Sequence, residues 1–423
     1  MNFPNTNLKD LVLHLRNVSP FYRKHYSNCD INWENLNNYT EFSLLPYLER
    51  SHVHHYSSAF HSEDIQITRI FCSGGTLGEP KTLFYTEIDW KQSIEANINC
   101  LKMMGISKND VVAILQPFGI WSIGSVFLES VAKLGARALP LGIYLDDEDI
   151  LSLFEKHCVT AIMAAPGNIC RLTVKAIEKK IFPYNNFGVR MLILSGEKYS
   201  QNQKQYLTKN WSSDVISLYG SAETDSIGSE CISCGSHRIL SNDFFFEVLT
   251  DEGSKILTPG NTGELIVTSI YREGTPLIRY RLGDIVKVTS PCKDCESSSP
   301  GIKILGRLNK YISLIEGTKL FDYQIERAIE LVTSMMFACQ VTVTEDNGRD
   351  FLKVIVFCEK DDPKLAGLIR QNLLKASIDF LDATKAGLVS DLEVECRPMS
   401  NLQLNQRGKQ IKFIDLRSNI ELI

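Results

Sequence analysis

A glycine-rich segment at residues 72–81 has the residue types that bind an oxyanion. It reads Cys-Ser-Gly-Gly-Thr-Leu-Gly-Glu-Pro-Lys and directly follows an apolar run that we expect to be a strand. Glycines let the backbone approach a phosphate closely and aim several N–H groups at it, while Ser73, Thr76 and Lys81 add two hydroxyls and a positive charge. The spacing fits neither GxxxxGK[ST] nor GxGxxG, which disfavours a P-loop NTPase and a Rossmann dinucleotide site. Taken alone, the same composition also suits a flexible surface turn.

Two Cys-x-x-Cys pairs form a second group of chemically capable residues. Cys231 and Cys234 lie in one polar segment, and Cys292 and Cys295 lie in another further along the chain. In a reducing compartment, such pairs fit a structural zinc site in which four ligands close the coordination sphere. His237 follows the first pair, so five candidate ligands compete for four positions. The alternative is a set of unrelated thiols in two loops.

The composition is that of a globular protein and excludes several classes of function. The chain has 423 residues, of which 44% are hydrophobic and 22% charged, with a net charge of −5. This balance excludes a disordered chain and argues against a nucleic-acid partner, because nucleic-acid binding depends on basic patches. The N-terminal residues lack a basic start followed by an apolar core, and no run approaches the ~18 apolar residues of a membrane helix. We therefore expect no signal peptide, no membrane association and a cytoplasmic location.

Short apolar runs separated by amphipathic segments predict an α/β fold with parallel sheets from about residue 65 onwards. Two later runs, Glu264–Ser269 and Asp284–Thr289, are predicted to be antiparallel strands of a smaller β subdomain. The pattern changes at Gly306-Arg307, and a compact α+β unit follows. We predict an N-terminal domain over 1–305, a hinge at 306–310 and a C-terminal domain over 311–423. The elements predicted in the α/β part are Ile65–Cys72, Val111–Leu115, Arg137–Leu141, Thr160–Ala164 and Met191–Leu194 as strands and Ser122–Leu134 as a helix.

The motifs together resemble those of the adenylate-forming superfamily, in particular its phenylacetate–coenzyme A ligase branch. The glycine-rich segment is similar to that family's Ser-Ser-Gly-Thr-Thr-Gly-x-Pro-Lys phosphate loop, with Gly74 and Leu77 in place of two hydroxyl residues. The resemblance covers nearly the whole chain and implies the family's fold, in which the small C-terminal domain is mobile. The other matching motifs, in order, are Ser19-Pro20-Phe21-Tyr22-Arg23, Leu218-Tyr219-Gly220-Ser221-Ala222-Glu223, Gly263-Glu264-Leu265, Arg279-Tyr280-Arg281-Leu282-Gly283-Asp284, Gly306-Arg307, the segment from Gly317 through Ile325-Glu326, and Arg407-Gly408-Lys409.

The resemblance implies that the chain binds ATP and Mg²⁺ and converts a carboxylic acid to an acyl-AMP. Glu223 is similar to the magnesium ligand, Tyr219 to the residue that stacks on adenine, and Asp284 to the carboxylate that binds the ribose hydroxyls. Lys409 is similar to the catalytic lysine that reaches the α-phosphate when the small domain closes, and Lys412 is a nearby rival. Ordinary structural uses of each residue stay open. The remaining nucleotide-binding candidates are Ser73, Gly74, Gly75, Thr76, Gly78, Lys81, Ser195, Gly196, Glu197, Gly220, Ser221 and Arg307.

Residues 116–122 resemble the segment that lines the acyl pocket in that branch. Phe118 and Trp121 predict a flat apolar wall suited to an aromatic or other planar acid, with core packing as an equal alternative. Gly196 and Tyr219 are expected to help form the floor of this pocket. No aspartate is clearly placed to hold an α-ammonium group, so an amino acid substrate stays open but is not indicated.

The acceptor of the acyl group is left open between two thiols. In the nearest relatives it is coenzyme A, and in others it is the phosphopantetheine arm of an acyl carrier protein. Relatives in this branch also carry a Cys…His…Cys-x-Cys zinc cluster in the two cysteine segments, which implies structural Zn²⁺ here. A homodimer is left open. The third hypothesis is a catalytically silent nucleotide-binding relative, supported by Leu77 and by Asn309, which stands where the family's hinge has aspartate.

Overall fold

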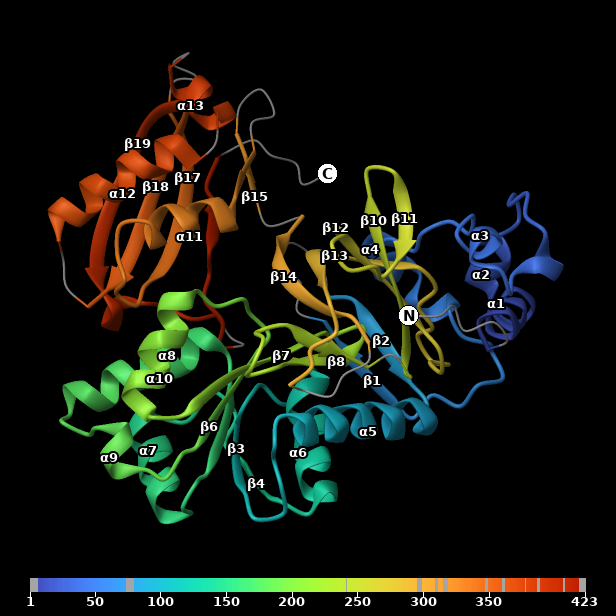
Figure 1. Ribbon diagram of the computed structural model, residues 1–423, viewed down its shortest axis with the longest axis horizontal. Coiled ribbons are helices and arrows are strands. Elements are labelled where there is room, and N and C mark those ends of the chain that lie inside the picture. The colour runs from blue at the N-terminus through green and yellow to red at the C-terminus, as the bar shows by residue number, and fades with distance from the viewer. Residues whose placement is uncertain are drawn as a thin grey trace. The chain divides into compact units, whose positions relative to one another are not determined.

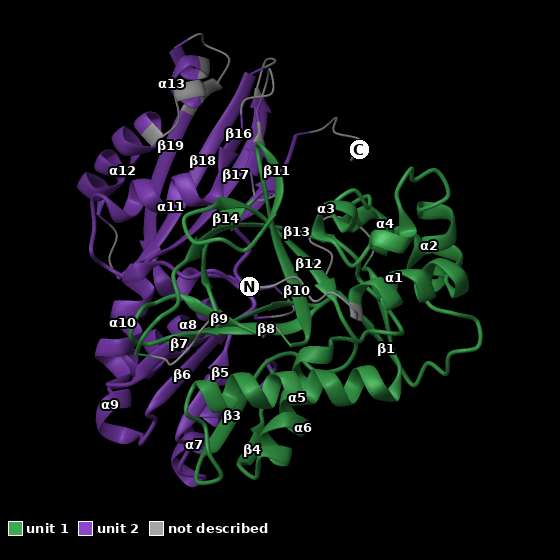
Figure 2. Ribbon diagram, turned by 45° about the vertical axis from the view of Figure 1, so that its right-hand side comes forward, with its two compact units in different colours: residues 1–142, 216–307 green, residues 143–215, 308–423 purple. Residues whose placement is uncertain are grey.

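The computed structural model describes most of the chain, in two compact units. The first unit comprises residues 1–142 and 216–307, and the second comprises 143–215 and 308–423 (Figure 2). One boundary between them falls between Arg307 and Leu308, inside the predicted hinge. The division into domains 1–305 and 311–423 stays a prediction. The described residues are 7–73, 80–240, 242–294, 299–308, 311–314, 319–346, 349–359, 362–376, 378–385, 389–405 and 408–417.

Unit 1 combines helices with a mostly antiparallel sheet (Figure 1). The first helices begin with recognisable caps. Ser19 accepts a hydrogen bond from the Tyr22 N–H, and Pro20 occupies the first turn, where no backbone donor is needed. Thr86 and Asp89 form a capping box at the start of the longest of these helices. The helices are α1 Asn7–Val18, α2 Pro20–His25, α3 Tyr39–Phe42, α4 Arg50–Tyr56, α5 Glu87–Met103 and α6 Ser122–Leu134.

Strands of unit 1 fall into three groups. One is a short antiparallel pair, one is a parallel pair, and the largest is a sheet in the order β11-β10-β12-β13-β14-β9-β8-β7. Most residues of β8, β10 and β12 are buried. The buried residues of β10 and β12 are mainly apolar, whereas those of β8 are mainly polar. The strands are β1 Arg69–Cys72, β2 Thr82–Tyr85, β3 Val111–Leu115, β4 Arg137–Pro140, β7 Asp214–Ser221, β8 Asp225–Glu230, β9 His237–Ile239, β10 Phe244–Thr250, β11 Gly253–Ile256, β12 Thr262–Ser269, β13 Tyr280–Thr289 and β14 Gly301–Arg307.

Unit 2 contains a parallel strand pair, β5–β6, and a four-stranded sheet in the order β19-β18-β17-β20. Helices α11 and α12 lie side by side against one face of that sheet (Figures 1 and 2), and an apolar core fills the space between helices and strands. Its elements are α7 Asp147–Lys156, β5 Ala161–Ala164, α8 Pro166–Glu178, α9 Pro183–Asn186, β6 Met191–Ser195, α10 Gln201–Trp211, β15 Tyr311–Ser313, β16 Lys319–Phe321, α11 Asp322–Glu330, β17 Ala338–Asp346, β18 Arg349–Cys358, α12 Pro363–Ala376, α13 Ile378–Lys385, β19 Val389–Pro398 and β20 Phe413–Asp415.

The predicted fold class is confirmed: the chain is α/β, with parallel pairs in its first half and an antiparallel β region before residue 308. The predicted strand Ile65–Cys72 is shorter than expected and begins at Arg69, because its partner β2 ends at Tyr85, opposite Arg69. Among the described residues, no helix combines the length and the apolar character required to span a membrane.

Candidate active site

Two hydrogen bonds between Ser73 and Lys81 join the two ends of the glycine-rich segment. The Ser73 N–H donates to the Lys81 carbonyl oxygen at 2.8 Å, and the Lys81 N–H donates to the Ser73 hydroxyl at 3.2 Å. Both residues are buried and lie at the ends of the hairpin β1–β2. This hairpin therefore fixes where the loop leaves and re-enters the sheet. The predicted phosphate-binding residues Gly74, Gly75, Thr76 and Gly78 lie outside the described residues.

Glu223 and Lys81 lie against each other in unit 1. Their side chains form a buried ion pair, and the Tyr280 hydroxyl donates to the same carboxylate oxygen of Glu223 at 3.0 Å. Burial, followed by the Arg50 and Arg307 cations, lowers the pKa of the Lys81 ammonium to about 7, whereas the contact with Glu223 favours its charged form. Lys81, predicted to contact phosphate, and Glu223, predicted to bind magnesium, are thus partners in one buried ion pair.

A tight turn presents Glu223 after strand β7. A Cβ atom on Gly220 would lie 2.0 Å from the Asp225 carbonyl oxygen, so only glycine fits there. The Ser221 N–H donates to the Thr224 hydroxyl at 3.1 Å, which closes the turn. Gly220 and Ser221, predicted as nucleotide contacts, therefore shape the backbone that carries Glu223.

Asp225 anchors this turn and was missed by the sequence analysis. Its carboxylate is buried, accepts a hydrogen bond from the Ser93 hydroxyl at 2.6 Å and forms an ion pair with Arg272. Its backbone has a φ of 54°, in the left-handed region that aspartate tolerates better than most residues. The spacing Glu-Thr-Asp gave no signal for this buried carboxylate, because its partners Ser93 and Arg272 lie 132 and 47 residues away in the sequence.

Tyr219, Asp284 and Arg307 form a connected group. The Tyr219 hydroxyl donates to Asp284 Oδ2 at 2.7 Å, and Arg307 Nε lies 2.6 Å from Asp284 Oδ1. Asp284 and Arg307 are directly opposite each other in strands β13 and β14. Burial and then the Asp284 charge raise the pKa of the Tyr219 hydroxyl well above its usual range, so it stays a donor. Three residues predicted for the nucleotide's base and sugar are therefore adjacent.

The arginines before Asp284 have structural partners. Arg279 is fully buried and forms two hydrogen bonds with Glu247, at 3.0 and 3.1 Å. Arg281 donates to Glu264 at 2.6 and 2.8 Å, and the Gly283 N–H donates to the other oxygen of Glu264 at 3.1 Å. Paired guanidinium–carboxylate contacts of this kind fix geometry as well as charge. Glu247 was missed, although a single carboxylate within the apolar run Phe244–Thr250 is a signal for a buried cation.

Lys409 lies in unit 2 beside the end of strand β6. Its Nζ donates to the Gly196 carbonyl oxygen at 2.8 Å, and the N–H of the next residue, Gln410, donates to Glu197 Oε1 at 2.8 Å. A Cβ on Gly196 would lie 2.7 Å from Lys409 Nζ, and the φ of 83° at Gly196 also favours glycine. The predicted residue Gly196 thus contacts the predicted catalytic lysine, and Glu197 binds the residue after that lysine, within one unit. Ser195 is the last residue of strand β6, directly before them.

Lys412, the rival of Lys409, has a different environment. Its ammonium forms a buried ion pair with Glu326 and lies 4.0 Å from Asp322, both on helix α11. Although burial opposes the charged form, the two carboxylates raise the pKa of Lys412 above its ordinary value. A lysine committed in this way supports the fold of unit 2, which leaves Lys409 as the better catalytic candidate.

Phe118 and Trp121 flank the start of helix α6. A Cβ on Gly124 would lie 2.8 Å from Phe118 Cγ, so the ring packs on the first turn of that helix. Trp121 is half-buried, and its Nε1 donor has no hydrogen-bond partner among the described residues. The two rings are thus partly exposed and partly packed. Their role as a wall for an acid stays a prediction.

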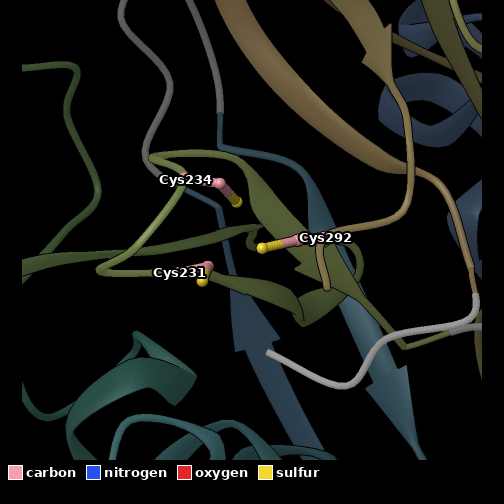
Figure 3. Close-up of side chains that lie close together, drawn as sticks. All are labelled: Cys231, Cys234 and Cys292. Carbon is pink, nitrogen blue, oxygen red and sulfur yellow. The ribbon is translucent and has the colours of Figure 1, made fainter. Parts of the chain in front are cut away.

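Three thiols gather in unit 1, as Figure 3 shows. The sulfur atoms of Cys231, Cys234 and Cys292 all lie within 4.8 Å of one another, from the turn after β8 and the segment after β13. Gly235, at a φ of 64°, turns the chain so that its N–H donates to the Cys231 carbonyl oxygen at 2.8 Å. Thiolates at this spacing fit three of the four ligands of a tetrahedral zinc site.

The fourth ligand has two candidates. Cys295 lies outside the described residues. His237 begins strand β9, packs its ring 5.7 Å from that of Tyr219, and is not within the group of mutually close ligand atoms that the described residues form. The described ligand group therefore consists of three cysteines, and the fourth ligand stays open between Cys295 and His237.

Comparison with known proteins gives relatives over most of the chain. No family model matches. The chain is 24% identical to phenylacetate–coenzyme A ligase of Aromatoleum evansii, covering 82% of this chain and 79% of the relative. It is 23% identical to indoleacetate–lysine synthetase of Pseudomonas savastanoi, covering 82% and 84%.

A solved structure has the same fold. It is 2-hydroxyisobutyryl-CoA ligase in its postadenylation state with 2-HIB-AMP, with a TM-score of 0.79 and 18% identity over 97% of this chain and 88% of that one. Its likeness to this chain shows the fold. The predicted resemblance is therefore confirmed: the chain is similar in sequence to phenylacetate–coenzyme A ligases over four-fifths of its length, and it shares the fold of an acyl-CoA ligase.

Proposed function

We propose that the protein uses ATP to activate a carboxylic acid as an acyl-adenylate, releases pyrophosphate, and transfers the acyl group to coenzyme A. The observation that carries this proposal is the Tyr219–Asp284–Arg307 group beside the Lys81–Glu223 pair in unit 1. Buried carboxylates and cations with fixed partners suit a reaction in which positioning and charge neutralisation provide most of the catalysis. The acyl-CoA ligases among the relatives support the same chemistry.

The roles follow from the chemistry of each group. Asp284, an acceptor with two oxygens, is proposed to bind the ribose hydroxyls, and Tyr219 to lie against adenine. Lys409 is proposed to neutralise the α-phosphate while the substrate carboxylate attacks it and pyrophosphate leaves. When bound, Mg²⁺ would neutralise phosphate charge, and Glu223 is the residue proposed to hold it. The acid is proposed to be aromatic or otherwise planar, on the grounds of Phe118 and Trp121.

The proposal has three further parts, which concern a structural zinc ion, the hinge between domains and the cellular location of the reaction. The Cys231–Cys234–Cys292 group is proposed to hold a structural Zn²⁺ with no part in the reaction. Residues 306–310 are proposed as the hinge, supported by the unit boundary after Arg307. Because ATP and coenzyme A are supplied in the cytoplasm, the reaction is proposed to occur there.

The test is an acid-dependent pyrophosphate-release assay with ATP and magnesium and a panel of aromatic, short-chain and amino acids. We expect at least one aromatic acid to accelerate release, and Lys409→Ala to abolish most of that acceleration while the exposed-lysine control Lys364→Ala does not. Consumption of coenzyme A in the second step separates a coenzyme A ligase from an enzyme that loads a carrier protein. If every acid is without effect while ATP still binds, the protein is a silent relative and the proposal is wrong.

A further inference from the structure

The seven residues after strand β6 contact residues much further along the chain in unit 2. We name Gly196–Asn202 the docking segment. At its start, the Gly196 carbonyl accepts from Lys409 Nζ, and Glu197 Oε1 accepts from the Gln410 N–H, both at 2.8 Å. The segment therefore holds both the side chain of Lys409 and the backbone just after it.

At its other end, the docking segment binds the region after helix α11. Asn202 Nδ2 donates to the carbonyl oxygens of Thr333 at 2.8 Å and Met335 at 2.9 Å, which uses both hydrogens of its amide. The Gln201 N–H donates to Glu330 Oε1 at 3.2 Å. Asn202 is 8% exposed, so losing its amide leaves two partly buried carbonyls without these donors.

Glu197 is half-buried, and both of its carboxylate oxygens lie near protein atoms. Oε1 accepts from Gln410, and Oε2 lies 3.5 Å from where a Cβ on Gly167 would stand, at the first turn of helix α8. A charged acceptor on a backbone N–H is about twice as strong as a neutral one. This placement argues for Glu197 as a residue that acts on the Lys409 loop, in contrast to its predicted role as a nucleotide contact.

We propose that Glu197 and Asn202 are positioning residues for adenylation, which hold Lys409 in the arrangement that reaches the α-phosphate. The inference rests on the proposed function, because it assigns to Lys409 the task of neutralising that phosphate. Glu197 acts on the lysine through the Gln410 backbone, and Asn202 acts through the segment that follows α11. Neither residue touches the reacting atoms.

The experiment compares Glu197→Ala, Glu197→Gln and Asn202→Ala, each alone and combined with Lys409→Ala. We expect Glu197→Ala to lower acid-dependent pyrophosphate release about tenfold, the loss associated with one hydrogen bond to a charged acceptor. Glu197→Gln retains an oxygen acceptor and should recover most of the rate, and Asn202→Ala should fall between them. The equilibrium affinity for ATP should stay unchanged, and release of coenzyme A thioester from supplied acyl-AMP should be unaffected.

Two readouts decide the inference. In the Lys409→Ala background, Glu197→Ala should cause no further loss of residual activity, whereas a nucleotide contact would still weaken ATP binding. Amide hydrogen exchange should also rise at Gln410 in Glu197→Ala, and this measurement requires no turnover. Unchanged exchange at Gln410, or an equal rate loss with and without Lys409, overturns the inference. If the wild-type protein is inactive with every acid but Glu197→Ala still raises amide exchange at Gln410, the contact is real and the proposed function is wrong. The catalytic role of Glu197 and Asn202 is then wrong as well.

Discussion

Replacing Lys412 should destabilise the protein, whereas replacing Lys409 should remove activity. The Lys412 side chain is 10% exposed, and its partner Glu326 is 9% exposed. Lys412→Ala leaves the Glu326 and Asp322 carboxylates buried, with Lys198 at 3.7 Å from Glu326 as partial compensation. Breaking a buried ion pair costs about 3–5 kcal/mol of folding stability. Because Lys198 compensates part of the carboxylate charge, we expect Lys412→Ala to lose about 3 kcal/mol.

Thermal unfolding followed by circular dichroism measures the effect. A loss of about 3 kcal/mol corresponds to a melting temperature lower by roughly 6–12 °C for a unit of this size. The carboxylates raise the pKa of Lys412 despite its burial, so its stabilisation is complete below the unfolded-state pKa of about 10.4 and is lost only as pH rises through the higher folded value. The loss should therefore be constant through neutral pH. Lys409→Ala removes one hydrogen bond to a backbone carbonyl and should cost about 1 kcal/mol or less.

The control for the Lys412 prediction removes both charges together. The double variant Lys412→Met/Glu326→Leu leaves no uncompensated carboxylate at position 326 and should recover much of the lost stability. Pyrophosphate release per folded molecule should stay close to wild type in Lys412→Ala. If Lys412→Ala melts normally and loses adenylation while Lys409→Ala stays active, the assignment of the two lysines is reversed.

Three further predictions concern other parts of the chain. Asp284→Asn should raise the KM for ATP by about tenfold or more in steady-state kinetics, because it removes the carboxylate charge that is proposed to receive the ribose hydroxyls. Metal analysis of purified protein should find zinc, and Cys292→Ser should lower the zinc content while the exposed-cysteine control Cys158→Ser should not; equal zinc in both variants would rule out the site. Burial and then His52 lower the pKa of His25, so the unfolded state binds a proton at higher pH than the folded state does. The free energy of unfolding should therefore fall as the pH drops below about 6.5. In melting curves recorded at several pH values, His25→Phe should flatten this dependence, and an unchanged slope would contradict the prediction.

Sequence periodicity was sufficient where an element is decided by its own apolar pattern. Strand β3 and helix α6 have the predicted bounds, since one is an unbroken apolar run and the other ends at a glycine in the left-handed conformation. Strand β1 was predicted too long because its length depends on β2, which must end where the cap of helix α5 begins at Thr86. The apolar pattern of one strand does not show where its partner strand ends.

The residues of the candidate site could likewise be predicted only in part from the sequence. Motif order was enough to select Glu223, Asp284 and Lys409, but it gave no information on what each of them contacts. Lys409 and Lys412 are three positions apart and equally polar, and only burial against Glu326 separates them. Hubs such as Asp225 depend on partners brought together by the fold, so no local spacing could have identified them.

The Asp284–Arg307 ion pair connects the carboxylate proposed to bind ribose with the last residue of unit 1. Arg307 is its last residue, one peptide bond from unit 2, and its guanidinium lies on the carboxylate proposed to receive the sugar hydroxyls. In the proposed function, an arriving ribose competes with Arg307 for Asp284. In the proposed function, a bound ribose therefore weakens the Asp284–Arg307 ion pair at the point where the chain leaves strand β14.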